Sequence, residues 1–171
     1  MQKLLILILA VFTLLGCSKP SAEEMFKKGV DAQKAEQFND AIDAYQQLVN
    51  TYPDSARSPE ALYAIAAIYQ NNKRSYNEAI LTFRKFNEKY PNHPLAASAS
   101  FLVGFIYNND LKKYDSARIA YQEFINKFPD NQLVSSAQFE LENLGKDPNE
   151  IFKEKTQMAQ QETKPAKKKK K

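Results

Sequence analysis

Residues 37–54 read QFNDAIDAYQQLVNTYPD, and the same pattern returns in residues 75–92 and 113–130, at a constant offset of 38 residues. The later copies read SYNEAILTFRKFNEKYPN and KYDSARIAYQEFINKFPD. Five columns match in all three copies, and they are Phe38/Tyr76/Tyr114, Ala41/Ala79/Ala117, Tyr45/Phe83/Tyr121, Leu48/Phe86/Phe124 and Pro53/Pro91/Pro129. Self-similarity at a fixed period predicts stacked copies of one supersecondary unit.

Each copy has the pattern of an amphipathic helix. Apolar residues recur at i, i+3 or i+4, and i+7, which is the period of a helix with one buried face. We expect the N-caps at Asn39, Asn77 and Asp115, because their side-chain oxygens can accept hydrogen bonds from the free amides of a first turn. The aromatic–proline pair is expected to end each helix, since proline has no N–H to donate and disfavours helix at the preceding residue.

A further helical stretch precedes each copy, in residues 22–36, 59–72 and 96–110. Each repeat therefore reads as helix, turn, helix and proline break, which is a helical hairpin. Small residues at Gly29, Ala66 and Gly104 are expected where the two helices of a hairpin approach closely. The predicted fold class is all-α, a helical-hairpin repeat solenoid of three repeats.

The motif resembles the tetratricopeptide repeat, with alanine, an aromatic residue four positions later, and proline twelve positions after the alanine. The family period is about 34 residues, so four residues are extra. We expect three of them between the proline and the next helix, and one in the turns at residues 71–76 and 108–114. Such lengthened repeats resemble the BamD-like outer-membrane assembly lipoproteins of the Gram-negative envelope, and also the periplasmic partner of the Tol–Pal system. The resemblance covers about residues 22–145 and predicts fold more strongly than function.

The chain beyond the third repeat changes character in two steps. Residues 131–145 begin like another first helix, but Glu140, Glu142 and Asn143 make one side polar, which predicts a capping helix that Gly145 ends. Residues 146–171 are poor in apolar side chains and end in a lysine run. We expect a flexible basic tail, with one short helix near residues 151–159.

The N-terminus reads as an export signal. Residues 1–3 carry one lysine, residues 4–15 are an apolar run too short to span a bilayer as a helix, and Gly16 precedes Cys17. This arrangement resembles the lipobox of bacterial lipoproteins, which implies cleavage before Cys17, a diacylglyceryl group on its thiol and acylation of the new N-terminus. Two or more acyl chains attach a protein stably to a membrane, whereas one does so only marginally. The alternative is an ordinary secretory signal with an incidental cysteine.

Composition excludes several classes of site. One cysteine and one histidine cannot form an intramolecular disulfide, a zinc or iron–sulfur cluster, or a Cys–His nucleophile pair. No glycine-rich phosphate loop or paired-carboxylate site is recognisable, and His93 is expected in a surface loop. The chain is therefore predicted not to be an enzyme and to need no cofactor beyond the lipid on Cys17.

Charge is distributed unevenly along the chain. The formal net charge is +4, but setting aside Lys3 and the six lysines after residue 163 leaves 17 basic residues against 20 acidic ones. The body of the chain is therefore mildly acidic, and its C-terminal end is basic. The predicted organisation has a signal peptide, a repeat domain and a tail. Its segments are a signal peptide (1–16), Cys17 with a linker (17–21), hairpins at about 22–58, 59–96 and 97–130, the cap (131–145) and the basic tail (146–171).

In the tetratricopeptide family the first helices line a concave face, so the resemblance implies a binding groove there. Mapping the family positions predicts an aromatic ladder with polar neighbours. The candidates are Phe26, Tyr63, Phe101 and Phe139, then Phe105 with Val30 and Ala67, and the carboxamides Gln33, Gln70, Asn71, Asn108 and Asn109. Aromatic rings supply contact area and carboxamides can pair with a peptide backbone, so an extended, aromatic-bearing polypeptide is the expected ligand.

The sequence leaves two functions open. The first is a lipid-anchored scaffold on the outer membrane, facing the periplasm, which binds envelope proteins or unfolded outer-membrane protein segments. In bacterial lipoproteins, an aspartate directly after the lipidated cysteine retains some members in the inner membrane. Ser18 and Lys19 occupy these positions here, which favours the outer membrane. The alternative is a tether that organises the envelope, with Lys167 to Lys171 on an anionic cell-wall or lipid surface. Export argues against a nucleic-acid partner.

Overall fold

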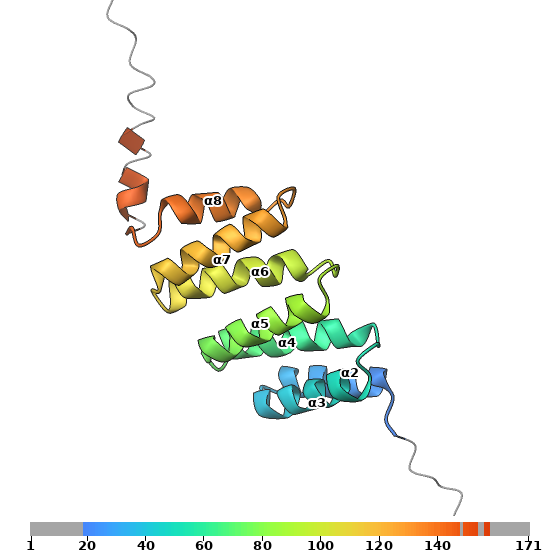
Figure 1. The fold of residues 1–171 in the computed structure, drawn as a ribbon. Helices are drawn as coiled ribbons and strands as arrows, with labels where there is room; N and C mark the ends of the chain where they lie inside the picture. Colours follow the sequence, from blue (N-terminus) through green and yellow to red (C-terminus); the bar gives the residue numbers. More distant parts are fainter. Residues whose placement is uncertain (1–18, 148, 154–155, 158–171) are drawn as a thin grey trace, which may run out of the picture. The chain divides into compact units, whose positions relative to one another are not determined.

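All the regular elements in the described residues are helical, which confirms the predicted fold class. The computed structural model describes residues 19–147, 149–153 and 156–157 (Figure 1). The elements are α2 (Ala22–Lys34), α3 (Phe38–Thr51), α4 (Arg57–Asn71), α5 (Tyr76–Lys89), α6 (Ala96–Phe105), the π-helical segment η1 (Ile106–Asp110), α7 (Tyr114–Lys127) and α8 (Val134–Glu142). The chain divides between Ala61 and Leu62 into two compact units.

The first unit is the hairpin of α2 and α3 with the start of α4. A capping box begins α2, in which the Ser21 hydroxyl accepts from the Glu24 amide and the Glu24 carboxylate accepts from the Ser21 amide. Tyr45 is buried in α3, and its ring lies where a Cβ on Gly29 would be. Glycine at this position therefore lets the two helices pack closely, as predicted.

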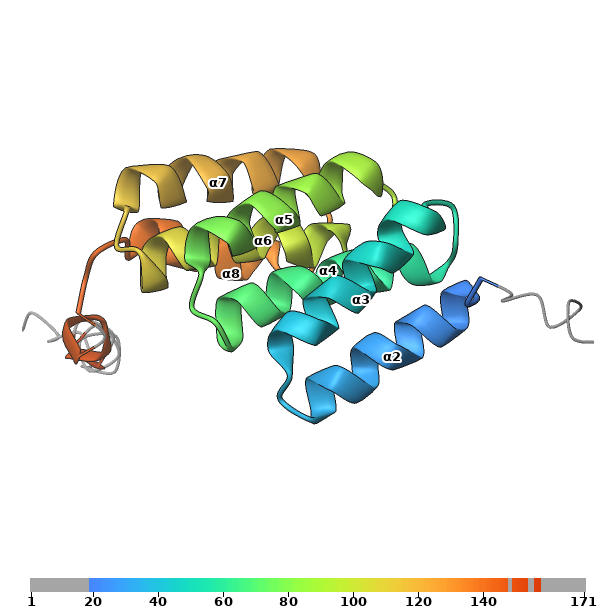
Figure 2. The same ribbon diagram turned by 90° about the horizontal axis from the view of Figure 1, so that it is seen from below.

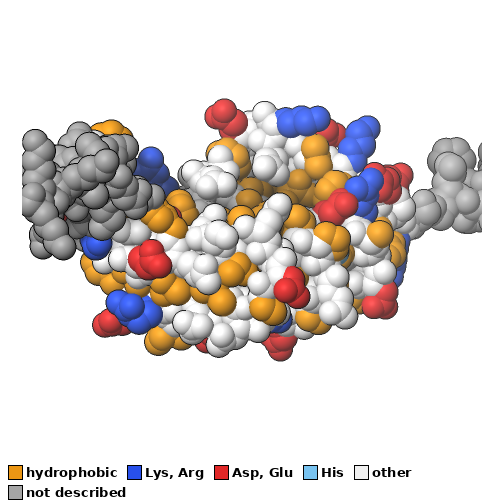
Figure 3. Space-filling model, turned by 90° about the horizontal axis from the view of Figure 1, so that it is seen from above, with side chains coloured by type: hydrophobic (Ala, Val, Ile, Leu, Met, Phe, Trp, Pro, Cys, Tyr) orange, Lys and Arg blue, Asp and Glu red, His pale blue; other side chains and the backbone are white. Residues whose placement is uncertain are grey.

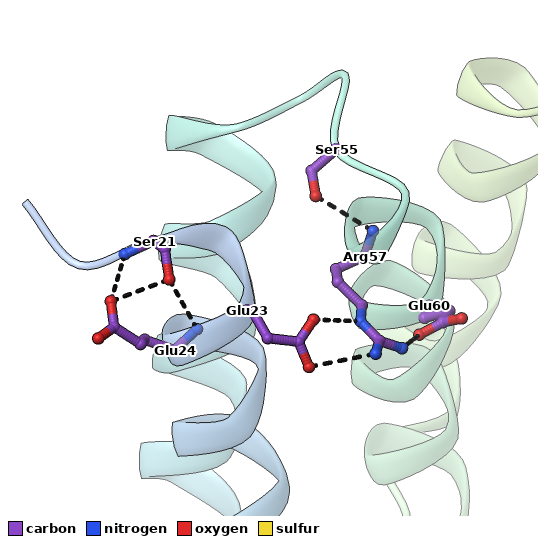
Figure 4. A network of polar contacts seen from close by, with 6 residues as sticks. All are labelled: Ser21, Glu23, Glu24, Ser55, Arg57 and Glu60. Atoms are coloured by element: carbon purple, nitrogen blue, oxygen red, sulfur yellow. Dashed lines mark hydrogen bonds and ion pairs between the residues drawn. The ribbon is translucent and has the colours of Figure 1, made fainter.

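Arg57 ties the start of α4 to α2 (Figure 4). Its guanidinium donates to both carboxylate oxygens of Glu23, at 2.7 and 3.1 Å, and to Glu60 at 2.7 Å. The guanidinium carbon also lies 4.9 Å from the centre of the Phe26 ring. A fork of donors facing a carboxylate fixes orientation as well as distance, so this contact holds the first turn of α4 against α2.

In the second unit, α5 and α7 form one layer and α6 and α8 lie in the other (Figures 1 and 2). Tyr121 and Phe124 of α7 are fully buried between α6 and α8. A Cβ on Gly104 would come within 2.9 Å of three Tyr121 ring carbons, so the close approach of the first hairpin recurs here.

The turn inside the second and third hairpins is one residue longer than in the first, as predicted. The closing bond of the first turn, from the Gln37 amide to the Ala32 carbonyl, spans five residues. The equivalent bonds, Ser75 to Tyr69 and Lys113 to Tyr107, span six. In the third hairpin the added residue widens the end of the first helix into η1.

The predicted N-caps were wrong by two residues. The caps are Gln37, Ser75 and Lys113, without side-chain cap bonds, and Asn39, Asn77 and Asp115 lie inside the first turn. Each cap follows a residue with positive φ, at 58° for Glu36, 51° for Arg74 and 54° for Lys112. This left-handed residue turns the chain directly into the second helix, so the cap is set by the turn rather than by an oxygen-bearing side chain.

The proline breaks end α3, α5 and α7 as predicted, at Thr51, Lys89 and Lys127. The turns that follow share one hydrogen bond at equivalent positions. Ser55 Oγ, His93 Nδ1 and Asn131 Oδ1 each accept from the amide two residues later, at 3.2, 3.2 and 3.0 Å. His93 is therefore a turn residue with a structural role, and its half-buried ring also packs edge-on against Phe86.

The capping helix α8 is shorter than the predicted range of 131–145. Ala137 is its buried residue, and Leu133, Val134, Leu141 and Leu144 pack against the Tyr121 cluster. Gly145 follows with a φ of 77°, which a side chain would strain. Residues 149–153 and 156–157 are helical, at the place where a short helix was expected.

Candidate functional site

Three rings of the predicted ladder pack within their own hairpins. Phe26 lies 5.6 Å from Tyr45, Tyr63 lies 5.3 Å from Phe83, and Phe101 lies 5.5 Å from Tyr121, as distances between ring centres. All three are half-buried. The second helix of each hairpin thus supplies an aromatic partner that fixes the ladder ring and leaves part of it at the surface.

Phe26 is covered further than its equivalents. Besides Tyr45, it contacts the Arg57 guanidinium, which Glu23 and Glu60 hold in place. These carboxylates also raise the pKa of Arg57 above its ordinary value, chiefly through the hydrogen bond with Glu23. The ring is therefore part of the α2–α4 contact, and its role in packing explains its presence.

Phe139, the fourth ring, is 37 % exposed and lines a pocket with Asn108. The pocket has a volume of about 430 Å³ and lies where η1, α7, α8 and the helical residues 149–153 meet. Its aromatic walls are Tyr114, Phe139 and Phe152. Asn109 lines it as well, so the structure brings three predicted candidates together at one end of the second unit.

Carboxamides supply the polar part of this pocket. Asn108 is only 8 % exposed, and its Nδ2 donates to Glu140 Oε2 at 2.8 Å. Asn109 and Asn143 donate to the Phe105 and Phe139 carbonyls of their own helices, at 3.3 and 2.7 Å. With their nitrogens held in this way, these two side chains offer carboxamide oxygens as acceptors to a ligand.

The pocket carries both signs of charge. Lys112, Lys146 and Glu140 line it, so it does not select one sign strongly. Burial raises the pKa of Tyr121, and the carboxylate of Glu140 raises it further. The phenol of Tyr121 therefore stays neutral.

On the face drawn in Figure 3, hydrophobic side chains form patches between separated acidic and basic side chains.

The remaining candidates lie apart from this pocket. Gln33 accepts from the Tyr45 hydroxyl at 3.2 Å and thus belongs to the first hairpin. Gln70 is half-buried and Asn71 is exposed, both at the end of α4. Val30, Ala67 and Phe105 are half-buried.

Sequence reasoning missed two of the pocket's aromatic residues. Tyr114 is 39 % exposed and Phe152 is 72 % exposed. The sequence pattern identifies Tyr114 only as a member of the matching positions Phe38, Tyr76 and Tyr114, and it places Phe152 only in the basic tail. A large apolar residue in an otherwise polar segment was the available signal for Phe152. Cys17 and Lys167 to Lys171 lie outside the described residues.

No cluster of three or more His, Cys, Asp or Glu side chains suited to a metal ion occurs in the described part of the chain. No helix in residues 19–147, 149–153 or 156–157 has the length and apolar character needed to cross a membrane.

Comparison with known proteins gives a family. The sequence model of the YfiO family, described as outer membrane lipoprotein, matches residues 18–164. The chain belongs to this family. The family recognised from the repeats is thereby confirmed, and Cys17 lies just outside the matched residues. No curated protein matches significantly.

Solved structures confirm the repeat fold. The Arabidopsis OM64 TPR domain superposes with a TM-score of 0.52 at 19 % sequence identity. The match covers 71 % of this YfiO-family chain and 93 % of the Arabidopsis domain. At this identity the likeness shows the fold alone, which is a tetratricopeptide repeat.

Proposed function

We propose that this chain is a lipid-anchored scaffold that binds polypeptide segments during the assembly of outer-membrane proteins, and that it faces the periplasm. Membership of the YfiO family supports the location, and the tetratricopeptide fold supports binding of protein partners. A repeat fold does not specify the ligand, so the ligand class is argued from the pocket.

The pocket beside Phe139 is the observation that carries the ligand class. Its volume of about 430 Å³ and its walls of Tyr114, Phe139 and Phe152 fit an aromatic or large aliphatic side chain. The carboxamide oxygens of Asn109 and Asn143 can accept from the amides of an extended backbone. The proposed ligand is a polypeptide segment in extended conformation that inserts one such side chain.

Photo-crosslinking tests the pocket. Benzoylphenylalanine at Phe139 in the full chain should capture envelope polypeptides, and the same probe at Tyr63 or Phe101 should capture them less efficiently, because those rings are half-buried. Asp43 is a matched control, since it is exposed on α3 and belongs to no proposed site. Capture at Phe139 no greater than at Asp43 would contradict the proposal.

The anchor is tested separately through Cys17. We expect Cys17→Ala to leave the helical circular dichroism unchanged and to release the chain from membranes, because two or more acyl chains are needed for stable attachment. Deletion of residues 164–171 serves as the comparison. If that deletion releases the chain while Cys17→Ala does not, the basic tail rather than a lipid is the attachment.

A further inference from the structure

Two large apolar side chains lie exposed at equivalent positions of α5 and α7. Leu81 is 67 % exposed and Ile119 is 59 % exposed. The first repeat has an exposed aspartate, Asp43, in the same column. The hairpin therefore does not need an apolar residue here for its own packing, and the two exposed side chains need another explanation.

A groove of about 630 Å³ lies between α5 and α7, and its lining begins one helical turn after Leu81 on α5 and one residue after Ile119 on α7. Both helices belong to the same layer of the second unit (Figures 1 and 2). Ser100 and Val103 of α6 are among the residues that line the groove. Leu81 precedes Arg84 by one helical turn, and Ile119 precedes Glu123 by one turn. Each helix thus carries an exposed apolar side chain about one turn before the charged side chains that line the groove.

The charges of the two helices follow opposite orders. Along α5, Arg84 is followed by Glu88, and along α7, Glu123 is followed by Lys127; all four line the groove. Arg84 and Glu123 already approach across it, with 3.9 Å between Nη2 and Oε2. The four side chains are exposed, so an intrachain pair of this kind contributes little to stability, and their charges remain available for another contact.

We propose that this surface, formed by α5 and α7 around the groove, is an interface between two copies of the chain. A two-fold axis parallel to α5 and α7 exchanges the positions of the two helices. It places Leu81 against Ile119 of the second copy, Arg84 against its Glu123, and Glu88 against its Lys127. Apolar side chains then meet apolar ones and each charge meets its opposite. Such self-complementarity is what an isologous dimer requires.

Disulfide crosslinking tests the geometry in membranes. Two differently tagged full-length chains carry Leu81→Cys and Ile119→Cys, and oxidation of the mixture should give several-fold more covalent dimer than either variant alone. The mixture should crosslink best because the two-fold axis brings position 81 of one copy close to position 119 of the other copy. It does not bring position 81 close to position 81 of the other copy, and a disulfide forms only between cysteines that lie close together. Asp43→Cys mixed with Ile119→Cys is the matched control, and the chain without added cysteine reports any crosslink through Cys17.

Sedimentation of the purified full chain tests the affinity. Leu81→Asp with Ile119→Asp, which copies the residue of α3, should raise the dissociation constant at least tenfold while the helical circular dichroism stays unchanged. Arg84→Glu should weaken association, and adding Glu123→Arg should restore it, because the swap returns every opposite-charge contact. The proposal is overturned if the unmodified chain still sediments as a monomer at concentrations far above about 1 μM, since standard-size interfaces have dissociation constants from the micromolar to the picomolar range. Equal crosslinking of Leu81→Cys alone, or capture of a different protein at position 81, would also overturn it.

Discussion

The Tyr45 ring lies where the side chain of any residue but glycine would be at position 29. A Cβ on Gly29 would come within 2.8 Å of three Tyr45 ring carbons, and Tyr45 itself is 1 % exposed and has no room to move. The glycine and the aromatic ring thus define the contact between α2 and α3. Gly104 and Tyr121 repeat this relationship in the third hairpin.

Gly29→Ala should therefore destabilise the protein. Overpacking a close helix contact costs about 1–3 kcal/mol, which exceeds the gain of about 1 kcal/mol in helix propensity from alanine. Urea unfolding followed by circular dichroism measures the difference. Ala66→Gly in the second hairpin is the comparison, and it should cost about 2 kcal/mol, from helix propensity together with the loss of a buried methyl group. A Gly29→Ala variant as stable as the unmodified chain would show that the hairpin can open at this point.

The hydroxyl groups of Tyr45 and Tyr121 should respond differently to removal. Tyr45 donates to Gln33 at 3.2 Å, whereas the buried Tyr121 hydroxyl has no hydrogen-bond partner among the described residues. Tyr45→Phe should lose about 1 kcal/mol, the net value of a typical hydrogen bond. Tyr121→Phe should be neutral or stabilising by up to about 2 kcal/mol, because it removes an unsatisfied buried group.

The equivalent residue of the second hairpin, Phe83, carries no hydroxyl and is also fully buried. The repeat therefore already accepts phenylalanine at this column. The free energies of unfolding of Tyr45→Phe and Tyr121→Phe, measured under the same conditions, test whether the two hydroxyl groups contribute differently. A larger loss for Tyr121→Phe than for Tyr45→Phe would mean that the Tyr121 hydroxyl has a partner in solution.

His93 should be replaceable by the residues that occupy its position in the other turns. His93→Ala removes the acceptor of the Leu95 amide and should cost about 1–2 kcal/mol, as the loss of a capping side chain does. His93→Asn retains an acceptor, as Asn131 does, and should cost less. Thermal unfolding of both variants distinguishes the two roles of the residue. Equal losses would assign the stabilisation to the ring contact with Phe86 instead.

The first turn of α2 should weaken in acid. Hydrogen bonds from the Ser21 amide and hydroxyl lower the pKa of Glu24 from its ordinary value of 4.5. A lowered pKa in the folded state means that the stabilisation is present above the unfolded-state pKa and is lost as the pH falls through the folded-state value. Glu24→Gln should therefore lower the melting temperature at pH 7 but have little effect at a pH below the lowered folded-state pKa of Glu24, where both side chains are neutral. An equal effect at both pH values would contradict the role of the charge.

Much of the fold could be read from the repeats. The columns at Ala41, Tyr45 and Pro53 carry enough information to place the second helices and their ends, because helix period and proline act locally. The small residues Gly29 and Gly104 were also recognised, and the structure supplies the rings that they face. The predicted N-caps were wrong, because each cap follows a residue in the left-handed conformation that is not glycine, such as Glu36. The residue type at such a position does not reveal its conformation.

The site depended on contacts that no local pattern contains. Equivalent positions predict equivalent rings, yet Arg57 covers Phe26 while Phe139 opens onto a pocket. Asn108 can be buried because its side-chain nitrogen donates a hydrogen bond to Glu140 of α8. The sequence by itself determined the hairpins, since each depends on residues within one repeat. Only the tertiary structure decided which side chains remain exposed, because exposure depends on what a distant helix brings against each one.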